Sequence, residues 1–337
     1  MTRRVLVARL DSAGDVLVSG PAVRAIARDA TVILLVGPRG RSAAELLPGP
    51  AEILVWEAPW IANPAPPATP LHLADLVERV RAARVDEAVI LTSFHQSPLP
   101  LALALRLAGV GRITGASTDY PGSLLDVRLR PGEDMPDDIP EPGRALAIAA
   151  AAGWSSTDSR LAVSGVRVPP GLPPRGGYVV LHPGASAPAR QAPVELFAEA
   201  ARILASRCWE IVVTGSADER GLAERIPSDV DLSGRLDLAS LAGTIEGAAA
   251  IVVGNTGPAH LAAAVGTPVV SLFSPVVPAA RWAPHGVPVR ILGDQGAACR
   301  GSRATECPVP GHPCLAAIAP EAIADAVDAL AREEVLA

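Results

Sequence analysis

Two series of alternating strand and helix patterns, separated by a proline- and glycine-rich segment, constrain the fold of this 337-residue chain most strongly. The predicted strands are continuous apolar runs, as in 4–10, 31–37 and 250–254, and helical patterns such as 16–29 follow them. Strands that are apolar on both faces and separated by helices are typical of parallel sheets covered on both sides. The sequence therefore predicts an α/β protein with two Rossmann-like parallel-sheet domains facing a cleft and a C-terminal helix packing back.

The segment VRVPPGLPPRGG, residues 166–177, marks the expected domain boundary. Its four prolines and three glycines cannot form a regular element. We therefore expect one domain at 1–165, this linker, a second domain at 178–318 and a final amphipathic helix within 319–337. A chain of this length suits about two domains of ordinary size.

Charge and hydropathy exclude several classes of function. The net charge is −6, and every fixed positive side chain is an arginine. No basic stripe is present, so we expect no nucleic-acid partner. No apolar stretch of about 18 residues is free of charges and breakers, and the apolar run near the N-terminus is too short for a signal peptide. The sequence thus predicts a cytoplasmic protein with no stable membrane insertion.

Three of the four cysteines, Cys299, Cys307 and Cys314, lie near the C-terminus close to His312, and the fourth is Cys208. Three thiols and an imidazole could hold zinc. The spacings are long, however, and no C-x-x-C pair is present. Reduced thiols in an irregular loop are the preferred interpretation, and no metal site is expected.

The first turn that could carry chemistry is RLDSAGDVLVSGP, from Arg9 to Pro21. Gly14 permits a tight turn, and Asp15 stands where the next helix begins. An aspartate in this position can be a helix N-cap, which contributes about 1 kcal/mol. It can also be a general base that takes a proton from a substrate hydroxyl.

The second turn, HPGASAPARQAPVELF, follows the predicted strand at 178–182. Gly184 and Ser186 precede Arg190, and Pro193 introduces the next helix. Backbone N–H groups, a hydroxyl and a fixed cation suit a phosphate group. An ordinary loop with a surface arginine is the alternative interpretation.

The third turn, GNTGPAHLAAAVG, places Asn255, Thr256 and Gly257 between an apolar strand and an alanine-rich helix with a proline in its first turn. Free N–H groups and the helix dipole favour an anion there. His260 lies in the same first turn, where the dipole disfavours its protonation. A packed core histidine is the alternative interpretation of His260.

Together these turns resemble the motifs of the ADP-heptose:lipopolysaccharide heptosyltransferase family, glycosyltransferase family 9, which has a two-domain GT-B architecture. Arg9, Gly14, Asp15 and Pro21 follow its N-terminal signature. HPGASAPARQAPVELF is similar to its HPGAS…K-x-W-P-x-E-x-F motif, and NTGPAHLAAAVGTP to its D-[TS]-G-x-x-H-L-A-A-A-x-G-x-P motif. The cysteine-bearing tail CPVPGHPCLAAIAPEAI also resembles the family pattern, so the similarity covers nearly the whole chain.

The resemblance implies an inverting, metal-independent glycosyltransferase that moves a heptose or a related sugar from an ADP-activated donor to an acceptor hydroxyl. The domain at 1–165 would bind the acceptor, either a lipopolysaccharide-core glycolipid or a small-molecule natural product. The domain at 178–318 would bind the nucleotide-sugar, which is a substrate, so no cofactor is expected. Two alternatives are a non-catalytic nucleotide-sugar-binding protein and a nucleotide-sugar epimerase of GT-B fold.

The resemblance also implies roles for individual residues. Asp15, preceded by the turn glycine Gly14, would be the catalytic base. The remaining roles belong to the donor: diphosphate binding by Ser186, Arg190, Thr256 and Gly257, sugar binding or loop support by Asn255 and His260, and ribose binding by Glu219. An exposed carboxylate at a helix start is the alternative interpretation of Glu219.

Three positions depart from the family pattern. Arg190 replaces a lysine, which exchanges a point charge for a broad fork. Ala192 replaces a tryptophan and opens space. Asn255 replaces an aspartate, which removes a charge and turns one acceptor into a donor. All three lie on the donor side, so the donor is expected to be either a heptose presented differently or another nucleotide-sugar, with the type of reaction unchanged.

Overall fold

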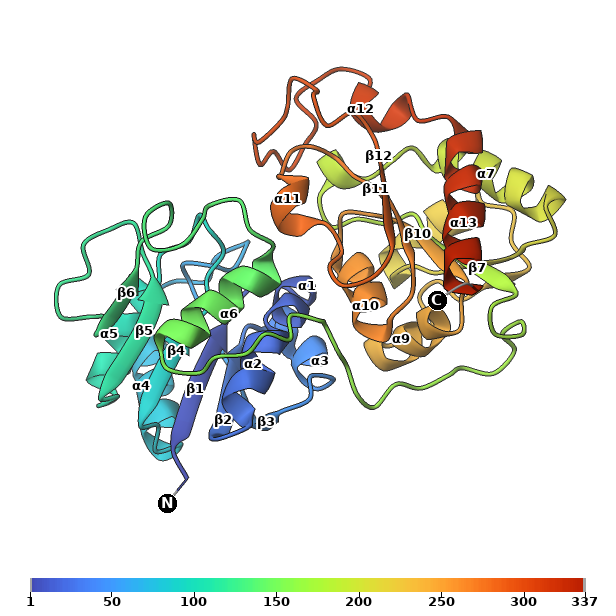
Figure 1. Ribbon diagram of the computed structural model, residues 1–337. Coiled ribbons are helices and arrows are strands. Elements are labelled where there is room, and N and C mark those ends of the chain that lie inside the picture. The colour runs from blue at the N-terminus through green and yellow to red at the C-terminus, as the bar shows by residue number, and fades with distance from the viewer. Residues whose placement is uncertain (1, 336–337) are drawn as a thin grey trace. The chain divides into compact units, whose positions relative to one another are not determined.

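A computed structural model describes residues 2–335, and the chain divides between Ser164 and Gly165 into two compact units. Each unit contains one six-stranded sheet in which all strands are parallel, with helices around it (Figure 1). The predicted α/β class with two parallel sheets is therefore confirmed.

The first sheet has the strand order β3-β2-β1-β4-β5-β6. Its central strand β1 is apolar on both faces, and Val5, Leu6 and Val7 are completely buried. Residues that alternate along a strand face opposite sides, so this strand contributes to two cores. The strands are β1 (Arg4–Arg9), β2 (Thr31–Val36), β3 (Pro50–Val55), β4 (Glu87–Ile90), β5 (Arg112–Ala116) and β6 (Val127–Leu129).

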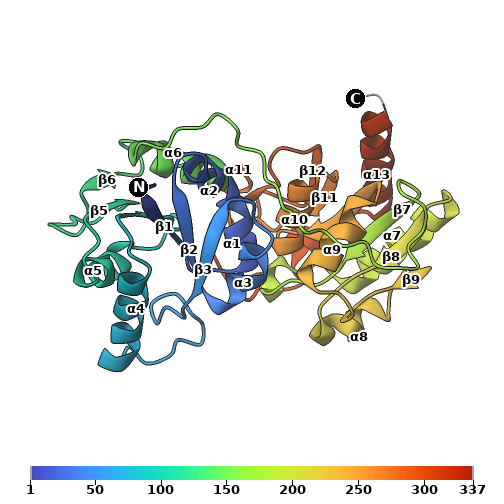
Figure 2. The same cartoon turned by 90° about the horizontal axis from the view of Figure 1, so that it is seen from below.

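Helices cover both faces of this sheet. Leu6 of β1 shares a core cluster with Leu76 and Leu101, which come from α4 and α5. On the opposite side, α2 and α6 pack against each other (Figure 2). The helical elements are α1 (Ala13–Val18), α2 (Gly20–Ala27), η1 (Pro38–Gly40), α3 (Arg41–Ala44), α4 (Pro70–Ala82), α5 (Leu99–Leu107) and α6 (Glu141–Ala151).

The second sheet has the strand order β12-β11-β10-β7-β8-β9. Its strands are β7 (Tyr178–His182), β8 (Glu210–Val213), β9 (Val230–Asp231), β10 (Ala250–Gly254), β11 (Val269–Leu272) and β12 (Val289–Leu292). The C-terminal helix α13 (Pro320–Val335) packs on this sheet and on α7 (Val194–Ser206). The other helical elements are η2 (Pro188–Arg190), η3 (Ala217–Glu219), α8 (Arg220–Ala223), α9 (Leu238–Glu246), α10 (Gly257–Val265), α11 (Ala279–Trp282) and α12 (Pro313–Ala316).

The two sheets repeat one topology. If the strands of each unit are counted from its own first strand, both have the order 3-2-1-4-5-6. The chain reverses direction across such a sheet between strands 1 and 4, and ligands bind beyond the carboxyl ends at that point. These strand pairs are β1 with β4 and β7 with β10. The three turns singled out in the sequence follow β1, β7 and β10, so all three lie at such a point.

Candidate functional site

The guanidinium of Arg9 organises the carboxyl edge of the first sheet. Arg9 ends β1 and is only 2% exposed. Its Nη2 donates to Asp15 Oδ1 at 2.7 Å and to Ser93 Oγ at 2.8 Å, the latter just beyond β4. Its Nε forms an ion pair of 2.9 Å with Asp11 Oδ2, and its Nη1 lies 3.4 Å from Glu141 Oε2 on α6. A single buried cation thus draws together three carboxylates from three segments.

Asp15 is placed by a capping box at the start of α1. Ser12 is the N-cap, and Asp15 is the third helical residue. Asp15 Oδ2 accepts hydrogen bonds from Ser12 Oγ at 2.6 Å and from the Ser12 N–H at 3.2 Å. The prediction that Asp15 could itself be the N-cap is therefore wrong, because the chain provides a serine for that position. Its carboxylate nevertheless satisfies a backbone donor of the helix start.

The surroundings of Asp15 keep it ionised. Burial alone would raise the pKa of this carboxyl group, but the charge of Arg9 and the donors of Ser12 outweigh burial and lower the pKa below its usual value. Hydrogen bonds and an opposite charge both stabilise the ionised form. About a sixth of the side chain, 17%, remains exposed. Asp15 is therefore a partly exposed carboxylate whose ionised form is stabilised.

Asp11 is a functional candidate that the sequence reasoning missed. It lies two residues beyond β1, with 12% of its side chain exposed, and its Oδ1 accepts a hydrogen bond from the Gln96 amide. Burial and the neighbouring charge of Asp15 raise its pKa, against the opposing effect of Arg9. The signal was present in the motif itself, since RLDSAGD contains two carboxylates four residues apart. Only the second belonged to the family signature.

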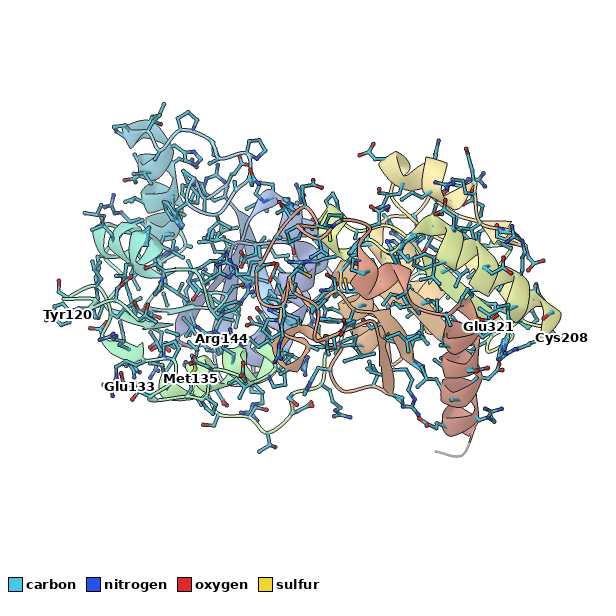
Figure 3. All side chains as sticks on the ribbon, turned by 90° about the horizontal axis from the view of Figure 1, so that it is seen from above. Tyr120, Glu133, Met135, Arg144, Cys208 and Glu321 are labelled. Atoms are coloured by element: carbon cyan, nitrogen blue, oxygen red, sulfur yellow. The ribbon has the colours of Figure 1, made fainter. Side chains whose placement is uncertain are left out.

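Glu141 and Arg144 complete the charged layer beneath this edge. Both come from α6 and are buried, at 2% and 4% exposed, and Figure 3 labels Arg144. Arg144 Nε donates to the carbonyl of Thr92 at 3.2 Å, beyond the end of β4. Burial raises the pKa of Glu141, against the opposing charges of Arg9 and Arg144. Glu141 therefore connects α6 to the first turn through Arg9, and Arg144 connects α6 to the segment after β4.

In the second unit, Glu219 lies over the turn that follows β7. A Cβ atom at Gly184 would overlap the Glu219 carboxylate, so only a glycine leaves room for it. Glu219 Oε2 accepts a hydrogen bond of 2.7 Å from the Ser216 N–H in a second capping box. It also lies 3.9 Å from Nε2 of His182, whose Nδ1 is bonded to Thr214 Oγ1 at 3.0 Å. Burial lowers the pKa of His182.

The cysteine-bearing segment 299–314 contacts the turn at Pro188–Arg190, called the Arg190 turn below. The N–H of Ala189 donates to the carbonyl of Thr305 at 2.9 Å, and His312 Nε2 donates to the Ala189 carbonyl at 3.2 Å. Cys299 is buried in a small apolar cluster with the same Ala189. Both backbone groups of one residue in η2 are thus bound by the tail, which fixes the chain immediately before Arg190.

The Arg190 turn also touches the third turn. A Cβ at Gly254, the last residue of β10, would lie 2.8 Å from the Arg190 carbonyl oxygen, so the two segments are in close backbone contact. Thr256 is the N-cap of α10, and Gly257 is its first residue. Thr256 Oγ1 is buried with no hydrogen-bond partner among the described residues. The N–H groups of a helix N-terminus and a half-buried arginine therefore lie on adjacent segments.

Asn255 has a structural partner. Its Nδ2 lies 3.4 Å from the Ser274 carbonyl oxygen, and its Oδ1 lies 3.4 Å from the Ser274 N–H nitrogen. One amide side chain therefore pairs with both backbone groups of a residue beyond β11. This favours the loop-support role over contact with a sugar. His260 is buried in α10, as a packed core group would be.

Two further predicted residues, Ser186 and Ala192, lie in different surroundings. Ser186 is exposed in the turn after β7. Ala192, where the family has tryptophan, is 3% exposed and belongs to the core of the second unit, so the expected open space is filled.

Within residues 2–335, no group of three His, Cys, Asp or Glu side chains could hold a metal ion, and the four cysteines are unpaired thiols. No helix in the same range is long and apolar enough to cross a membrane.

Comparison with known proteins matches this chain to one family. A model of glycosyltransferase family 9 (heptosyltransferase) matches residues 155–311. Lipopolysaccharide heptosyltransferase 1 of Pseudomonas aeruginosa is 35% identical over 113 residues, which span 32% of this chain and only 31% of that relative.

Solved structures match almost the whole chain. E. coli ADP-heptose lps heptosyltransferase II has a TM-score of 0.74 at 21% identity, covering 98% of this chain and 99% of that one. A glycosyltransferase family 9 protein from Veillonella parvula gives 0.76 at 16% identity, covering 98% and 97%. E. coli heptosyltransferase WaaC with ADP gives 0.72 at 16% identity, covering 97% and 99%. The fold of this chain is therefore the GT-B fold of these proteins.

Proposed function

We propose that this chain, whose residues 155–311 match the model of glycosyltransferase family 9 (heptosyltransferase), transfers a heptose or a related sugar from an ADP-activated donor to an acceptor hydroxyl. One observation supports this most strongly. The ionised, partly exposed Asp15 stands at the carboxyl edge of one sheet, and an anion-binding set stands at the corresponding edge of the other. A base and an anion site are the two parts that glycosyl transfer needs.

In the proposed reaction, Asp15 binds the acceptor hydroxyl and promotes loss of its proton. The acceptor oxygen forms a bond to the anomeric carbon, the bond from that carbon to the diphosphate breaks, and the diphosphate leaves with the electron pair. Attack opposite the leaving group inverts the anomeric centre. A positioned general base contributes typically 10²- to 10⁴-fold to such a step.

The leaving diphosphate requires positive charge as the bond breaks. We assign this role to Arg190 together with the Thr256 hydroxyl and the N–H of Gly257 at the N-terminal end of α10. The N–H of Thr256 donates to the Gly254 carbonyl oxygen at 2.9 Å and is not part of the assignment. Glu219, which lies over Gly184, is assigned to the ribose hydroxyls. Because the Arg190 guanidinium provides the positive charge at the diphosphate, we propose that transfer needs no divalent metal ion.

A panel of acceptors with ADP-heptose tests the function directly. The panel contains a lipopolysaccharide-core glycolipid and small hydroxylated natural products, and mass spectrometry of the product with ADP release is the measurement. We expect a heptosylated product and a loss of at least 10²-fold in kcat for Asp15→Asn. ADP release that is as fast with Asp15→Ala as with the wild type would show that Asp15 is not the base.

The diphosphate assignment is tested with Arg190→Ala and with EDTA. We expect Arg190→Ala to weaken binding of ADP at least tenfold and to lower kcat, because a charge-assisted contact of about 1.5–3 kcal/mol is lost. Arg202→Ala, an exposed arginine on α7, is the matched control. EDTA should leave the wild-type rate unchanged. Loss of activity in EDTA that Mg²⁺ restores would contradict metal-independent transfer.

A further inference from the structure

A groove in the first unit lies outside the sites assigned above. Its volume is about 420 Å³, which is within the range of small-molecule sites. Helix α2 forms one wall and contributes Arg24 and Arg28. The segment 156–158, which follows α6 and runs past α2, forms another wall (Figure 1). The groove also reaches Gly49, which directly precedes β3 at the amino edge of the sheet. Asp15 lies at the carboxyl edge, about 20 Å away along a six-residue strand.

Arg24 points an unused donor into enclosed space. Its Nη2 donates to the carbonyl of Arg160 at 2.5 Å and lies 3.6 Å from Asp158 Oδ2. Its Nη1 is buried and has no hydrogen-bond partner among the described residues. Burial lowers the pKa of this guanidinium, against the opposing charge of Asp158. A buried cationic donor without a partner is unfavourable, so an acceptor from a ligand would stabilise it.

The groove has more positive than negative charge. Asp158 is already bound by Arg160, whose N–H and Nε donate to Oδ1 at 3.1 and 2.9 Å. Arg28 donates only to the carbonyl oxygens of Ala25, at 3.4 Å from Nε, and of Ser155. Within residues 2–335, Arg28 forms no ion pair with a carboxylate. The two arginines of α2 therefore share one carboxylate that has a closer partner elsewhere.

This arrangement suits a phosphate group. Arg24 and Arg28 are four residues apart, so they lie on the same face of α2. Guanidinium groups bind phosphate through paired N–H donors. The groove is much larger than a phosphate group, and its lining also includes apolar atoms of Pro21, Ala25 and Pro48. A bound anion would thus have room for an organic part beside it.

We propose that this groove binds a small organic phosphate monoester. Its phosphate contacts the guanidinium groups of Arg24 and Arg28, and its organic part lies against the apolar wall. The phosphate belongs either to a separate small molecule or to the acceptor of the proposed transfer. Binding itself does not depend on that transfer, because the groove and the proposed base lie at different edges of the sheet.

Ser156 offers a test that leaves both arginines in place. Its Oγ accepts a hydrogen bond of 3.2 Å from the Asp158 N–H. Aspartate and asparagine side chains form the same local turn. Ser156→Asp therefore adds a negative charge to the groove, and Ser156→Asn is the matched neutral control.

The probe is phenyl phosphate at pH 7.5, where a phosphate monoester is mainly a dianion. The measurement is its titration into the full-length protein, followed by NMR of the backbone amides of Ala25 and Ala27. These amides report on the groove and not on Arg190 in the other unit. We expect saturable shifts in the wild type and in Ser156→Asn, and roughly tenfold weaker binding in Ser156→Asp because of charge repulsion. Equal affinities in the two Ser156 variants, or no shifts in the wild type, overturn the proposal.

Two further comparisons identify what the groove recognises. Arg28→Ala should weaken binding of phenyl phosphate about tenfold, whereas Arg41→Ala, an exposed arginine on α3, should not. Inorganic phosphate should bind more weakly than phenyl phosphate, since it lacks the organic part. Phenol that shifts the same amides at equal concentration would show an apolar site without phosphate recognition, and this result overturns the proposal.

Steady-state rates distinguish the two sources of the phosphate. A higher KM for the acceptor in Ser156→Asp than in Ser156→Asn, with kcat retained, assigns the phosphate to the acceptor. An equal KM assigns it to a separate small molecule. Only this comparison requires the proposed glycosyl transfer, so a protein that transfers no sugar would still show the NMR titration.

Discussion

At the residue scale, Asn255, which departs from the family motif, is explained by the backbone groups that it contacts. Its amide faces both the N–H and the carbonyl of Ser274. An aspartate could accept from the N–H but would turn a second acceptor toward the carbonyl oxygen. The departure therefore matches the backbone it pairs with, and it also adds no negative charge beside the proposed diphosphate site.

Asn255→Asp should accordingly weaken both the fold and donor binding. We expect a loss of about 1–3 kcal/mol in unfolding free energy, because a buried carbonyl loses its donor. KM for the nucleotide-sugar should rise, because the new charge repels the diphosphate. Asn63→Asp, at an exposed position, is the control and should change neither quantity. Chemical denaturation and initial rates measure the two effects; an unaltered stability would refute the pairing with Ser274.

Gly184 makes a second prediction at this scale. A methyl group there must displace the Glu219 carboxylate, so Gly184→Ala should weaken ADP binding several-fold if Glu219 holds the ribose. Gly221→Ala, where an added Cβ has no neighbour within 4 Å, is the control and should preserve binding. Calorimetric titration with ADP is the measurement. Equal affinity in the two variants would remove Glu219 from the nucleotide site.

At the scale of elements, the two carboxylates to which we assign functional roles, one in each unit, occupy the same local motif. Asp15 and Glu219 are each the third residue after a serine N-cap, with Ser12 and Ser216 as the caps. A capping box satisfies two backbone donors at a helix start. The same geometry fixes the carboxylate at the carboxyl edge of the preceding strand, so the structural and the functional interpretations are compatible.

Ser12→Ala tests this dual role. We expect a loss of about 1 kcal/mol in unfolding free energy from the cap. We also expect the pKa of Asp15 to rise, because a donor to its ionised form is lost. Carboxyl NMR titration and thermal unfolding measure the two effects. Ser216→Ala is the comparison: it should cost similar stability without moving the titration of Asp15.

The elements also show what the sequence could predict. Buried strands such as β1, β2, β7 and β10 were identified because their apolar runs are continuous. The edge strands β3, β6 and β12 are partly exposed and mixed in character, so no periodic signal marks them. The helix expected over 16–29 is two helices, α1 and α2, interrupted at Ser19.

Some residues of the candidate sites could likewise be predicted from the sequence, and others could not. The motif residues at the turns after β1, β7 and β10 could be named from sequence, since each turn stands at a strand end. The residues that bind these motif residues could not be named, because Glu141, Gln96 and Ser274 are distant in sequence from the residues they contact. No local sequence pattern marks such contacts. Asp11 lies in the same stretch as Asp15 but outside the family signature, which contains only Asp15.

At the scale of the whole molecule, stability should fall as the pH drops from 7 to 5 through His182. Burial depresses its pKa below the usual 6.5, so below that pH the unfolded chain binds a proton that the native protein does not. The loss can approach about 1.4 kcal/mol per pH unit. Above pH 7 both states are neutral, and His182 contributes no slope.

His182→Asn should therefore flatten the stability profile between pH 7 and 5 relative to the wild type, while the two profiles run parallel from pH 7 to 8. Urea denaturation at fixed pH values gives the comparison. Parallel profiles at all these pH values would show that the imidazole is protonated equally in both states.

The close approach of Gly184 and Glu219 has a consequence for descent as well as for binding. A side chain at 184 must displace the Glu219 carboxylate from its present place, and a shorter residue at 219 removes that reason for a glycine at 184. The two positions, 35 residues apart in the chain, should therefore vary in a correlated way. Among related sequences, we expect a side chain at the first position to be accompanied by loss of the glutamate at the second.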